Sequence, residues 1–337
     1  MHGQFAWYDL VTTDVAAAKK FYPPVTGWGT MPWADGAYTM WAANNQPLGG
    51  IAPISAEQSA QGIPSHWLAY VAVGDVDSSA RAATALGGQV LHGPEDIPDV
   101  GRFAIIRDPQ GGMVAIFRSS NATDGGWDGT PKTGHFSWHE LMTTDIDGAL
   151  RFYKGLFGWD KIEEMDMSPG ERYLEYGLNG KMFGGIYKRR PEHGDMPTSW
   201  TFYVNVPDLD ASVKAVKRQG GNVVMGPMEV PGGDRVAVCM DSQGASFALH
   251  QRKAARAAGA RKSAKKATAK KASAKKASAK KAGPRKAGAR KAKKTAGPSS
   301  RRTAKRSPRA ASKRATKKKS GARRTAPKPR SRSRGRR

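Results

Sequence analysis

The chain has 337 residues and a formal net charge of +28, but this charge is divided unevenly along it. Residues 251–337 contain 37 of the 56 Lys and Arg residues and no Asp or Glu. Residues 1–250 contain the other 19 basic residues and all 28 acidic ones, which gives them a formal charge of −9. The single cysteine, Cys239, excludes an internal disulfide framework. The sequence therefore predicts an acidic folded body followed by a basic tail.

The sequence also indicates in which cellular compartment the protein is expected. Its first residues, MHGQFAWYDLVTTD, lack a charged segment followed by an apolar one, and the chain has no apolar run of 18 residues. We therefore expect a cytoplasmic protein, associated with the nucleoid if it is bacterial.

The body contains an internal repeat. Residues Phe5–Trp28 and Phe136–Trp159 align at a constant offset of 131, with 11 of 24 positions identical. A second series aligns at an offset of 133 and includes Trp67 with Trp200 and Tyr70 with Tyr203. This self-similarity predicts a tandem duplication.

Each repeat is itself built from two similar modules. A module begins with a short alternating strand, continues through an Asp-capped amphipathic helix and ends with three strands separated by Gly and Pro turn signals. In the second repeat the expected elements are a strand at Phe136–Met142, a helix at Ile146–Phe157 and strands at Gly221–Met225, Asp234–Met240 and Ser246–Gln251. The order βαβββ, used four times, predicts an α+β fold.

These elements set the expected boundaries along the chain. The first domain covers residues 1–118 and a Gly-, Asp- and Pro-bearing linker covers residues 119–133. The second domain covers residues 134–251, and a disordered tail covers residues 252–337.

Several features of the body resemble the vicinal-oxygen-chelate superfamily of glyoxalase I, bleomycin-resistance proteins and extradiol dioxygenases. They are the paired βαβββ modules, the phrase HELMTTDIDGALRFYKGLFGW and the endings DPQGGMVAIF and DSQGASFALH. The resemblance covers nearly all of residues 3–251 and implies two domains of two modules each. It also implies a divalent ion held by His and Glu side chains.

The positions that the resemblance assigns to those metal ligands carry no ligand side chains. They are Trp7 and Trp138, the pairs Gly49-Gly50 and Gly184-Gly185, Leu68 and Thr201, and Ala115 and Ala248. We therefore expect neither a metal nor another cofactor. If the alignment were shifted by two residues, Asp9, Glu140 and His250 would be the substitute ligands, because they share strand-face parity with the lost ones.

The remaining side chains on that face suit a flat or amphipathic small molecule. The expected pocket residues are Trp7, Asp9, Tyr70, Phe117, Trp138, Glu140, Tyr203, Asn205 and His250. An alternative is that Trp7 and Trp138 only fill the space that a metal and substrate would occupy. Glu140 and His250 are the weak candidates for catalysis, as an acid/base pair if they lie within hydrogen-bond reach.

Other polar residues are expected elsewhere. Tyr8 and His139 alternate onto the opposite strand face, where they would pack or form hydrogen bonds. Two further pairs have less specific roles: His66 and His193 are expected at the surface, and Arg102 and Arg235 would either meet an anionic ligand or lie over a strand.

The tail resembles the C-terminal domain of linker histone H1 in composition, with the repeats AKKAT, AKKAS, AKKAS and AKKAG between Ala264 and Gly283. Such a polycation is expected to bind DNA or RNA without sequence specificity, through phosphate neutralisation. The residues expected to do so are Lys265, Lys266, Lys270, Lys271, Lys275, Lys276, Lys280, Lys281, Arg301, Arg302, Lys317, Lys318 and Lys319. No Phe, Tyr or Trp follows Phe247, so the tail cannot stack on bases.

Three functions are compatible with the sequence. The favoured one is a metal-free small-molecule-binding tandem protein that its tail tethers to nucleic acid. The alternatives are a metal-dependent lyase or dioxygenase with shifted ligands and an architectural nucleoid-associated protein. The sequence does not indicate the oligomeric state.

Overall fold

A computed structural model of the chain describes residues 2–33, 36, 38–121 and 132–253. Contacts along the chain divide it into two units, Met1–Lys280 and Lys281–Arg337, and every described residue belongs to the first unit. Among the described residues, no helix is long and apolar enough to cross a membrane.

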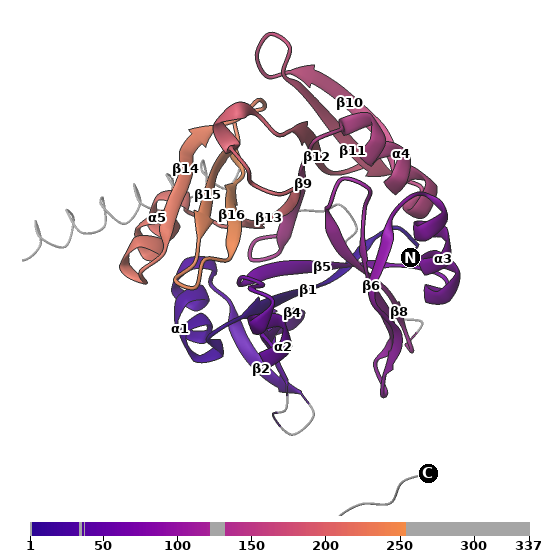
Figure 1. The fold of residues 1–337 in the computed structure, drawn as a ribbon. Coiled ribbons are helices and arrows are strands. Elements are labelled where there is room, and N and C mark those ends of the chain that lie inside the picture. Colours follow the sequence, from indigo (N-terminus) through magenta and orange to yellow (C-terminus); the bar gives the residue numbers. More distant parts are fainter. Residues whose placement is uncertain (1, 34–35, 37, 122–131, 254–337) are drawn as a thin grey trace, which may run out of the picture. The chain divides into compact units, whose positions relative to one another are not determined.

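The first half contains two βαβββ modules joined by a short helix (Figure 1). The first module comprises β1 (Phe5–Thr12), α1 (Val15–Thr26), β2 (Gly29–Trp33), β3 (Tyr38–Ala43) and β4 (Gln46–Pro53). After α2 (Ala56–Ala60), the second comprises β5 (His66–Ala72), α3 (Val76–Ala85), β6 (Gln89–Ile97), β7 (Gly101–Arg107) and β8 (Met113–Ser119).

The second half repeats this order. Its first module comprises β9 (Phe136–Thr143), α4 (Ile146–Phe157), β10 (Asp160–Asp166), β11 (Arg172–Leu178) and β12 (Lys181–Lys188). After the 3₁₀ turn η2 (Pro191–His193), the second comprises β13 (Ser199–Asn205), α5 (Leu209–Arg218), β14 (Asn222–Glu229), β15 (Arg235–Met240) and β16 (Ser246–Gln251). The predicted four-module α+β fold is confirmed.

Each half forms one eight-stranded sheet. The strand order is β2-β3-β4-β1-β5-β8-β7-β6 in the first half and β10-β11-β12-β9-β13-β16-β15-β14 in the second. The first strands of the two modules, β1 with β5 and β9 with β13, pair antiparallel in the middle of each sheet. The central position of β1 and β9 places their side chains where both flanking modules can reach them.

Aspartates start all four of the longer helices. Asp14, Asp75, Asp145 and Asp208 each accept a hydrogen bond from a backbone N–H three residues further on. Such a bond satisfies one of the donors that a helix start leaves without an intrahelical partner. This is why the caps read from the sequence place α4 at the predicted bounds.

Three strands of the second half differ slightly from the prediction. β9 ends at Thr143 rather than Met142. β14 begins at Asn222 rather than Gly221 and continues to Glu229, four residues beyond the predicted end at Met225. β15 begins at Arg235 rather than Asp234, because the backbone carbonyl of Asp234 closes the preceding turn by accepting from the Val230 N–H at 2.9 Å.

The two halves share one continuous hydrophobic core, which the sequence did not reveal. The rings of Phe5 and His139 stack with their centroids 3.8 Å apart, and those of Tyr8 and Phe136 do the same at 3.8 Å. The Tyr8 hydroxyl and His139 Nε2 also form a hydrogen bond of 2.5 Å. We call the sheet faces that carry these residues the core faces. Tyr8 and His139 thus lie opposite the expected pocket face, as the alternation predicted.

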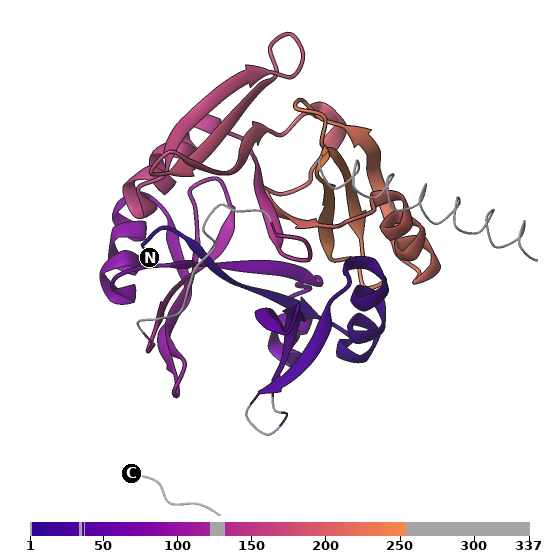
Figure 2. The same cartoon turned by 180° about the vertical axis from the view of Figure 1, so that it is seen from behind.

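Reciprocal hydrogen bonds link the halves around this core. The Tyr22 hydroxyl donates to Asp241 at 3.0 Å, and the equivalent Tyr153 donates to Asp108 at 2.9 Å. Figures 1 and 2 show α1 beside α5 and α3 beside α4, and both helix pairs are in contact. The two domains therefore pack against one another around a shared core.

Candidate functional site

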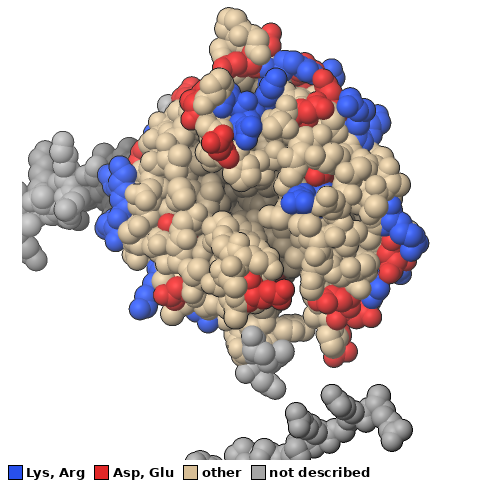
Figure 3. Space-filling model, in the orientation of Figure 1, with Lys and Arg blue, Asp and Glu red and all other residues tan. Residues whose placement is uncertain are grey.

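The candidate site occurs twice, once on the inner face of each sheet, which is the face opposite the core face. Strand alternation places Trp7 and Asp9 of β1 on the first inner face, and Trp138 and Glu140 of β9 on the second. In Figure 1, β10–β12 and β14–β16 flank β9 and β13, and Figure 3 shows the surface hollowed in the region of these strands.

On the first inner face, Asp9 is held by three donors from different strands. Its Oδ1 accepts from the Trp7 indole at 3.0 Å and from the Tyr38 hydroxyl at 2.5 Å, and its Oδ2 accepts from the Tyr70 hydroxyl at 2.9 Å. Asp9 is only 8% exposed. Both carboxylate oxygens therefore already have neutral hydrogen-bond donors.

On the second inner face, Glu140 is held in the same way. The Tyr173 hydroxyl donates to its Oε1 and the Tyr203 hydroxyl to its Oε2, each at 2.6 Å. The Trp138 indole donates to the Tyr173 oxygen at 2.9 Å. We call each group of one carboxylate, two tyrosines and one tryptophan a carboxylate–tyrosine cluster.

Glycine at the expected ligand positions makes room for these clusters. A Cβ atom on Gly50 would lie 1.5 Å from the Tyr38 hydroxyl oxygen, and one on Gly185 would lie 2.1 Å from that of Tyr173. The tyrosine ring therefore passes over the glycine to reach the carboxylate. Tyr38 and Tyr173 were missed by the sequence analysis, although both precede their glycine by 12 residues.

Burial dominates the electrostatics of both clusters. It raises the pKa of Asp9 above its ordinary value of 3.8 and that of Glu140 above 4.5, while the tyrosine hydrogen bonds oppose this rise. Burial and Asp9 together raise the pKa of Tyr38 and Tyr70, so both phenols stay protonated donors. A raised carboxyl pKa favours folding at low pH, and this contribution is lost as the pH rises through the raised pKa.

The side chains at these positions do not fit a divalent metal ion. Each inner face has one carboxylate at its centre, and both oxygens of this carboxylate already accept hydrogen bonds from tyrosine hydroxyls. A catalytic zinc-type site needs about three convergent protein ligands. Among the described residues, no group of three or more His, Cys, Asp or Glu side chains lies close enough together to hold an ion.

The predicted Glu140–His250 acid/base pair is not formed, because each side chain has other partners. His250 Nδ1 lies 2.9 Å from the Ser137 hydroxyl, and its Nε2 lies 2.8 Å from Asp234. Burial lowers the pKa of His250, although Asp234 opposes this. Within the described residues, no hydrogen bond joins Glu140 to His250. His250 instead fixes the end of β16 to β9.

The other two predicted pocket residues border the clusters. Phe117 packs its ring edge against Tyr70, with the centroids 6.2 Å apart. Asn205 is 3% exposed and lies opposite His250 in the β13–β16 ladder. The structure thus brings Trp138, Glu140 and Tyr203 into one cluster, and Trp7, Asp9 and Tyr70 into the other.

The remaining candidates have structural roles. Arg102 forms a two-point ion pair with Asp77 near the start of α3, and Arg235 does the same with Asp210 of α5. His66 and His193 are partly exposed beside turns. Neither arginine faces a carboxylate–tyrosine cluster.

The predicted nucleic-acid-binding residues, from Lys265 to Lys319, lie outside the described residues, as does most of the predicted linker. The geometry above therefore concerns the body alone.

Comparison with known proteins gave consistent matches over the body. The family model described as the Glyoxalase/Bleomycin resistance protein/Dioxygenase superfamily matches residues 4–116 and 132–249. CFP32 of Mycobacterium tuberculosis, named as a glyoxylase, is 34% identical over 247 residues, covering 72% of this chain and 92% of its own length. The anthracycline biosynthesis protein DnrV of Streptomyces peucetius is 28% identical over 271 residues, covering 73% and 92%.

Solved structures show the same fold at low sequence identity. The 2,2',3-trihydroxybiphenyl 1,2-dioxygenase of Sphingomonas wittichii superposes with a TM-score of 0.54 at 12% identity, covering 74% of this chain and 91% of that one. The Mn(II)-bound glyoxalase of Novosphingobium aromaticivorans gives 0.51 at 14%, covering 74% and 82%.

Proposed function

Because the chain belongs to the glyoxalase/bleomycin resistance protein/dioxygenase superfamily, we propose that its body keeps the superfamily's ligand-binding face but uses it without a metal. The ligand is a small planar organic molecule, bound on one or both inner faces. The basic tail holds this binding protein near nucleic acid.

The carboxylate–tyrosine clusters carry the proposal. Asp9 and Glu140 stand on the central strands, where a superfamily enzyme would place its reacting centre, and each is fixed by tyrosines from two other strands. Such rigid polar groups among aromatic rings are typical of small-molecule pockets. The cluster positions hydrogen-bond acceptors without needing an ion.

The chemistry of the cluster suggests how a ligand is held. Trp7 and Trp138 are partly exposed beside their carboxylates and offer rings for stacking. A ligand O–H or N–H can donate to the remaining lone pairs of Glu140 or to the Tyr203 hydroxyl oxygen, whose own proton already goes to Glu140. The name of the relative DnrV, an anthracycline biosynthesis protein, also favours a planar aromatic ligand.

The charge of the tail supports the other part of the proposal, that the tail holds the protein near nucleic acid. Its 37 basic residues, with no acidic residue among them, form a polycation that can displace the counterions of DNA or RNA. Because the body carries a formal charge of −9, it contributes repulsion rather than attraction to such a complex. Tethering is therefore assigned to the tail and ligand binding to the body.

We expect Trp138→Ala to weaken the binding of acridone, a neutral planar probe, by about tenfold, because the stacking surface next to Glu140 is lost. The measurement is a fluorescence titration of the full chain. Met196→Ala is the control, because Met196 is 52% exposed in the loop before β13 and is not one of the cluster residues. Unchanged acridone affinity in Trp138→Ala would mean that this tryptophan only fills space.

A further inference from the structure

The two inner faces differ in charge although their clusters match. In the second half, Glu163 of β10 lies directly opposite Glu175 of β11, and Glu175 lies opposite Gly185 of β12. Gly185 in turn lies opposite Glu140. Directly paired residues share a sheet face, so these three glutamates form one row across the inner face.

The corresponding row of the first half is apolar up to its carboxylate. Met31 of β2 lies opposite Met40 of β3, and Met40 lies opposite Gly50, which pairs with Asp9. Two methionines therefore stand where the second half has Glu163 and Glu175. The row was not visible in the sequence because a bulge in β10 interrupts the offset between the halves.

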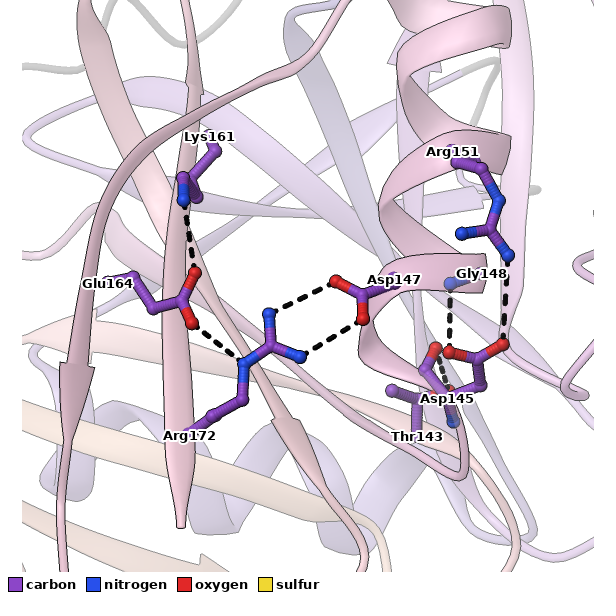
Figure 4. Close-up of polar contacts among 8 residues, drawn as sticks. All are labelled: Thr143, Asp145, Asp147, Gly148, Arg151, Lys161, Glu164 and Arg172. Carbon is purple, nitrogen blue, oxygen red and sulfur yellow. Dashed lines mark hydrogen bonds and ion pairs between the residues drawn. The ribbon is translucent and has the colours of Figure 1, made fainter. Parts of the chain in front are cut away.

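Nearby cations are engaged elsewhere. Figure 4 shows Lys161 and Arg172 directed at Glu164, with Arg172 also paired to Asp147 of α4. Arg190, which lies near the inner-face residue Tyr187, pairs with Glu171 and Glu192.

Among the described residues, no ion pair is formed by Glu163 or Glu175. Like charges directly opposite in a sheet destabilise it. Burial, which is the larger cause, and the charge of Glu163 both raise the pKa of Glu175.

At the opposite edge of the same inner face, the strands β14 and β15 carry exposed apolar side chains. Met225 and Met228 of β14 lie opposite Val238 and Val236 of β15, and they are 45% and 37% exposed. Val236 and Val238 pack with Tyr203 and Trp138. Large exposed apolar side chains next to an aromatic floor suit the body of an organic ligand.

In the first half, the equivalent strand β6 carries polar side chains instead. The positions equivalent to Met225 and Met228 are His92 and Glu95, which form an ion pair of 2.9 Å. Each inner face thus has a polar edge and an apolar edge. The polar edge is formed by β6 in the first half and by β10 in the second, and the apolar edge by β2 in the first half and by β14 in the second.

We propose that the second inner face binds an amphipathic organic cation, an amine-bearing planar aromatic molecule. Its positively charged nitrogen group lies against Glu163 and Glu175, its ring stacks beside Trp138, and its apolar edge lies against Met225 and Met228. The first inner face lacks the glutamate pair and has no preference for a cation at that edge. This inference depends on the proposed function, because it names the ligand class of the same site.

The test uses three probes with one ring system and different charges. They are 9-aminoacridine, a cation at neutral pH, neutral acridone, and anionic acridine-9-carboxylate. Each is titrated against the full chain by fluorescence, at an ionic strength that screens the tail. We expect 9-aminoacridine to bind about fivefold to tenfold more tightly than acridone.

The variant Glu163→Gln/Glu175→Gln removes both charges and keeps the side-chain size. It should abolish most of the preference for 9-aminoacridine while leaving acridone affinity within about twofold. The control, Asp99→Asn/Asp195→Asn, makes the same change of net charge at two exposed residues outside the row and should keep the preference.

The outcomes separate the two proposals. If acridone binds but 9-aminoacridine gains nothing, or if the Gln variant keeps the full preference, the cation assignment is wrong and the proposed function stands. If none of the three probes binds, both are overturned. A preference lost equally in the control would show long-range attraction by the body rather than a site, and would also overturn the inference.

Discussion

Phe136→Ala should lower the free energy of unfolding by about 3–5 kcal/mol. Phe136 is 2% exposed. The centroid of its ring lies 3.8 Å from that of Tyr8, 5.5 Å from that of Trp28 and 5.6 Å from that of Trp67, and all three residues belong to the other half. Truncation would therefore leave a cavity bordered by both halves, which rigid aromatic neighbours cannot close. The loss is measured by urea denaturation of the full chain.

The number of unfolding transitions tests the shared core more directly than the urea concentration at the midpoint of unfolding. Circular dichroism and tryptophan fluorescence should change together in both the wild type and the variant, because most buried apolar residues of the two halves belong to one core cluster. Phe117→Ala is the control. Phe117 is partly exposed on the first inner face, so its loss should cost less and should not involve the other half. Two separate transitions, of which Phe136→Ala moves only one, would contradict a shared core.

Removal of residues 254–337 should abolish nucleic-acid binding. The full chain should bind DNA and RNA of unrelated sequence alike, and its affinity should fall at least about a thousandfold between roughly 50 and 200 mM salt, because each neutralised phosphate releases a counterion. A chain ending at Lys253 keeps the bond between its backbone N–H and Asp234, and with it the described fold. Fluorescence anisotropy with labelled duplexes at several salt concentrations measures both effects.

The matched control for this truncation is the full chain carrying Trp138→Ala, which should bind nucleic acid as the wild type does. The truncated chain should in turn bind acridone as the wild type does. If the truncated chain held DNA as tightly as the full chain, the tail would not be the tether. If Trp138→Ala weakened DNA binding, the two activities would not be separable as proposed.

The sequence predicted best what depends on local pattern. α4 begins and ends at the predicted residues because an Asp cap precedes its apolar periodicity and Gly158 follows it in a left-handed conformation. β16 was also placed at its observed bounds, between a turn and the end of the body. The repeat offset then extended the prediction to all four modules.

What the sequence could not predict depends on contacts between distant strands. Tyr38 and Tyr173 reach their carboxylates across β4 and β12, so their role appears only when the strand register is known. The shared core joins residues 131 positions apart, as with Tyr8 and His139. Alternation along one strand shows which face a side chain takes but not what covers that face.

The pocket residues illustrate the same limit. Parity placed Asp9 with Trp7 and Glu140 with Trp138, and it also placed His250 on the same face, where an acid/base pair with Glu140 depended on the distance between them. The bulge at β9 instead brings Ser137 to His250, and the start of β15 brings Asp234. A shared face therefore did not imply a shared hydrogen bond.

The most direct test of the central claim is a calorimetric titration of the full chain with Mn²⁺, Fe²⁺, Ni²⁺ and Zn²⁺, repeated on Asp9→Asn/Glu140→Gln. We predict no stoichiometric binding to either inner face, so the wild type and the variant should give the same trace, while acridone still binds the wild type. One tightly bound ion per half, lost in the variant, would show that Asp9 and Glu140 are metal ligands and would contradict the account.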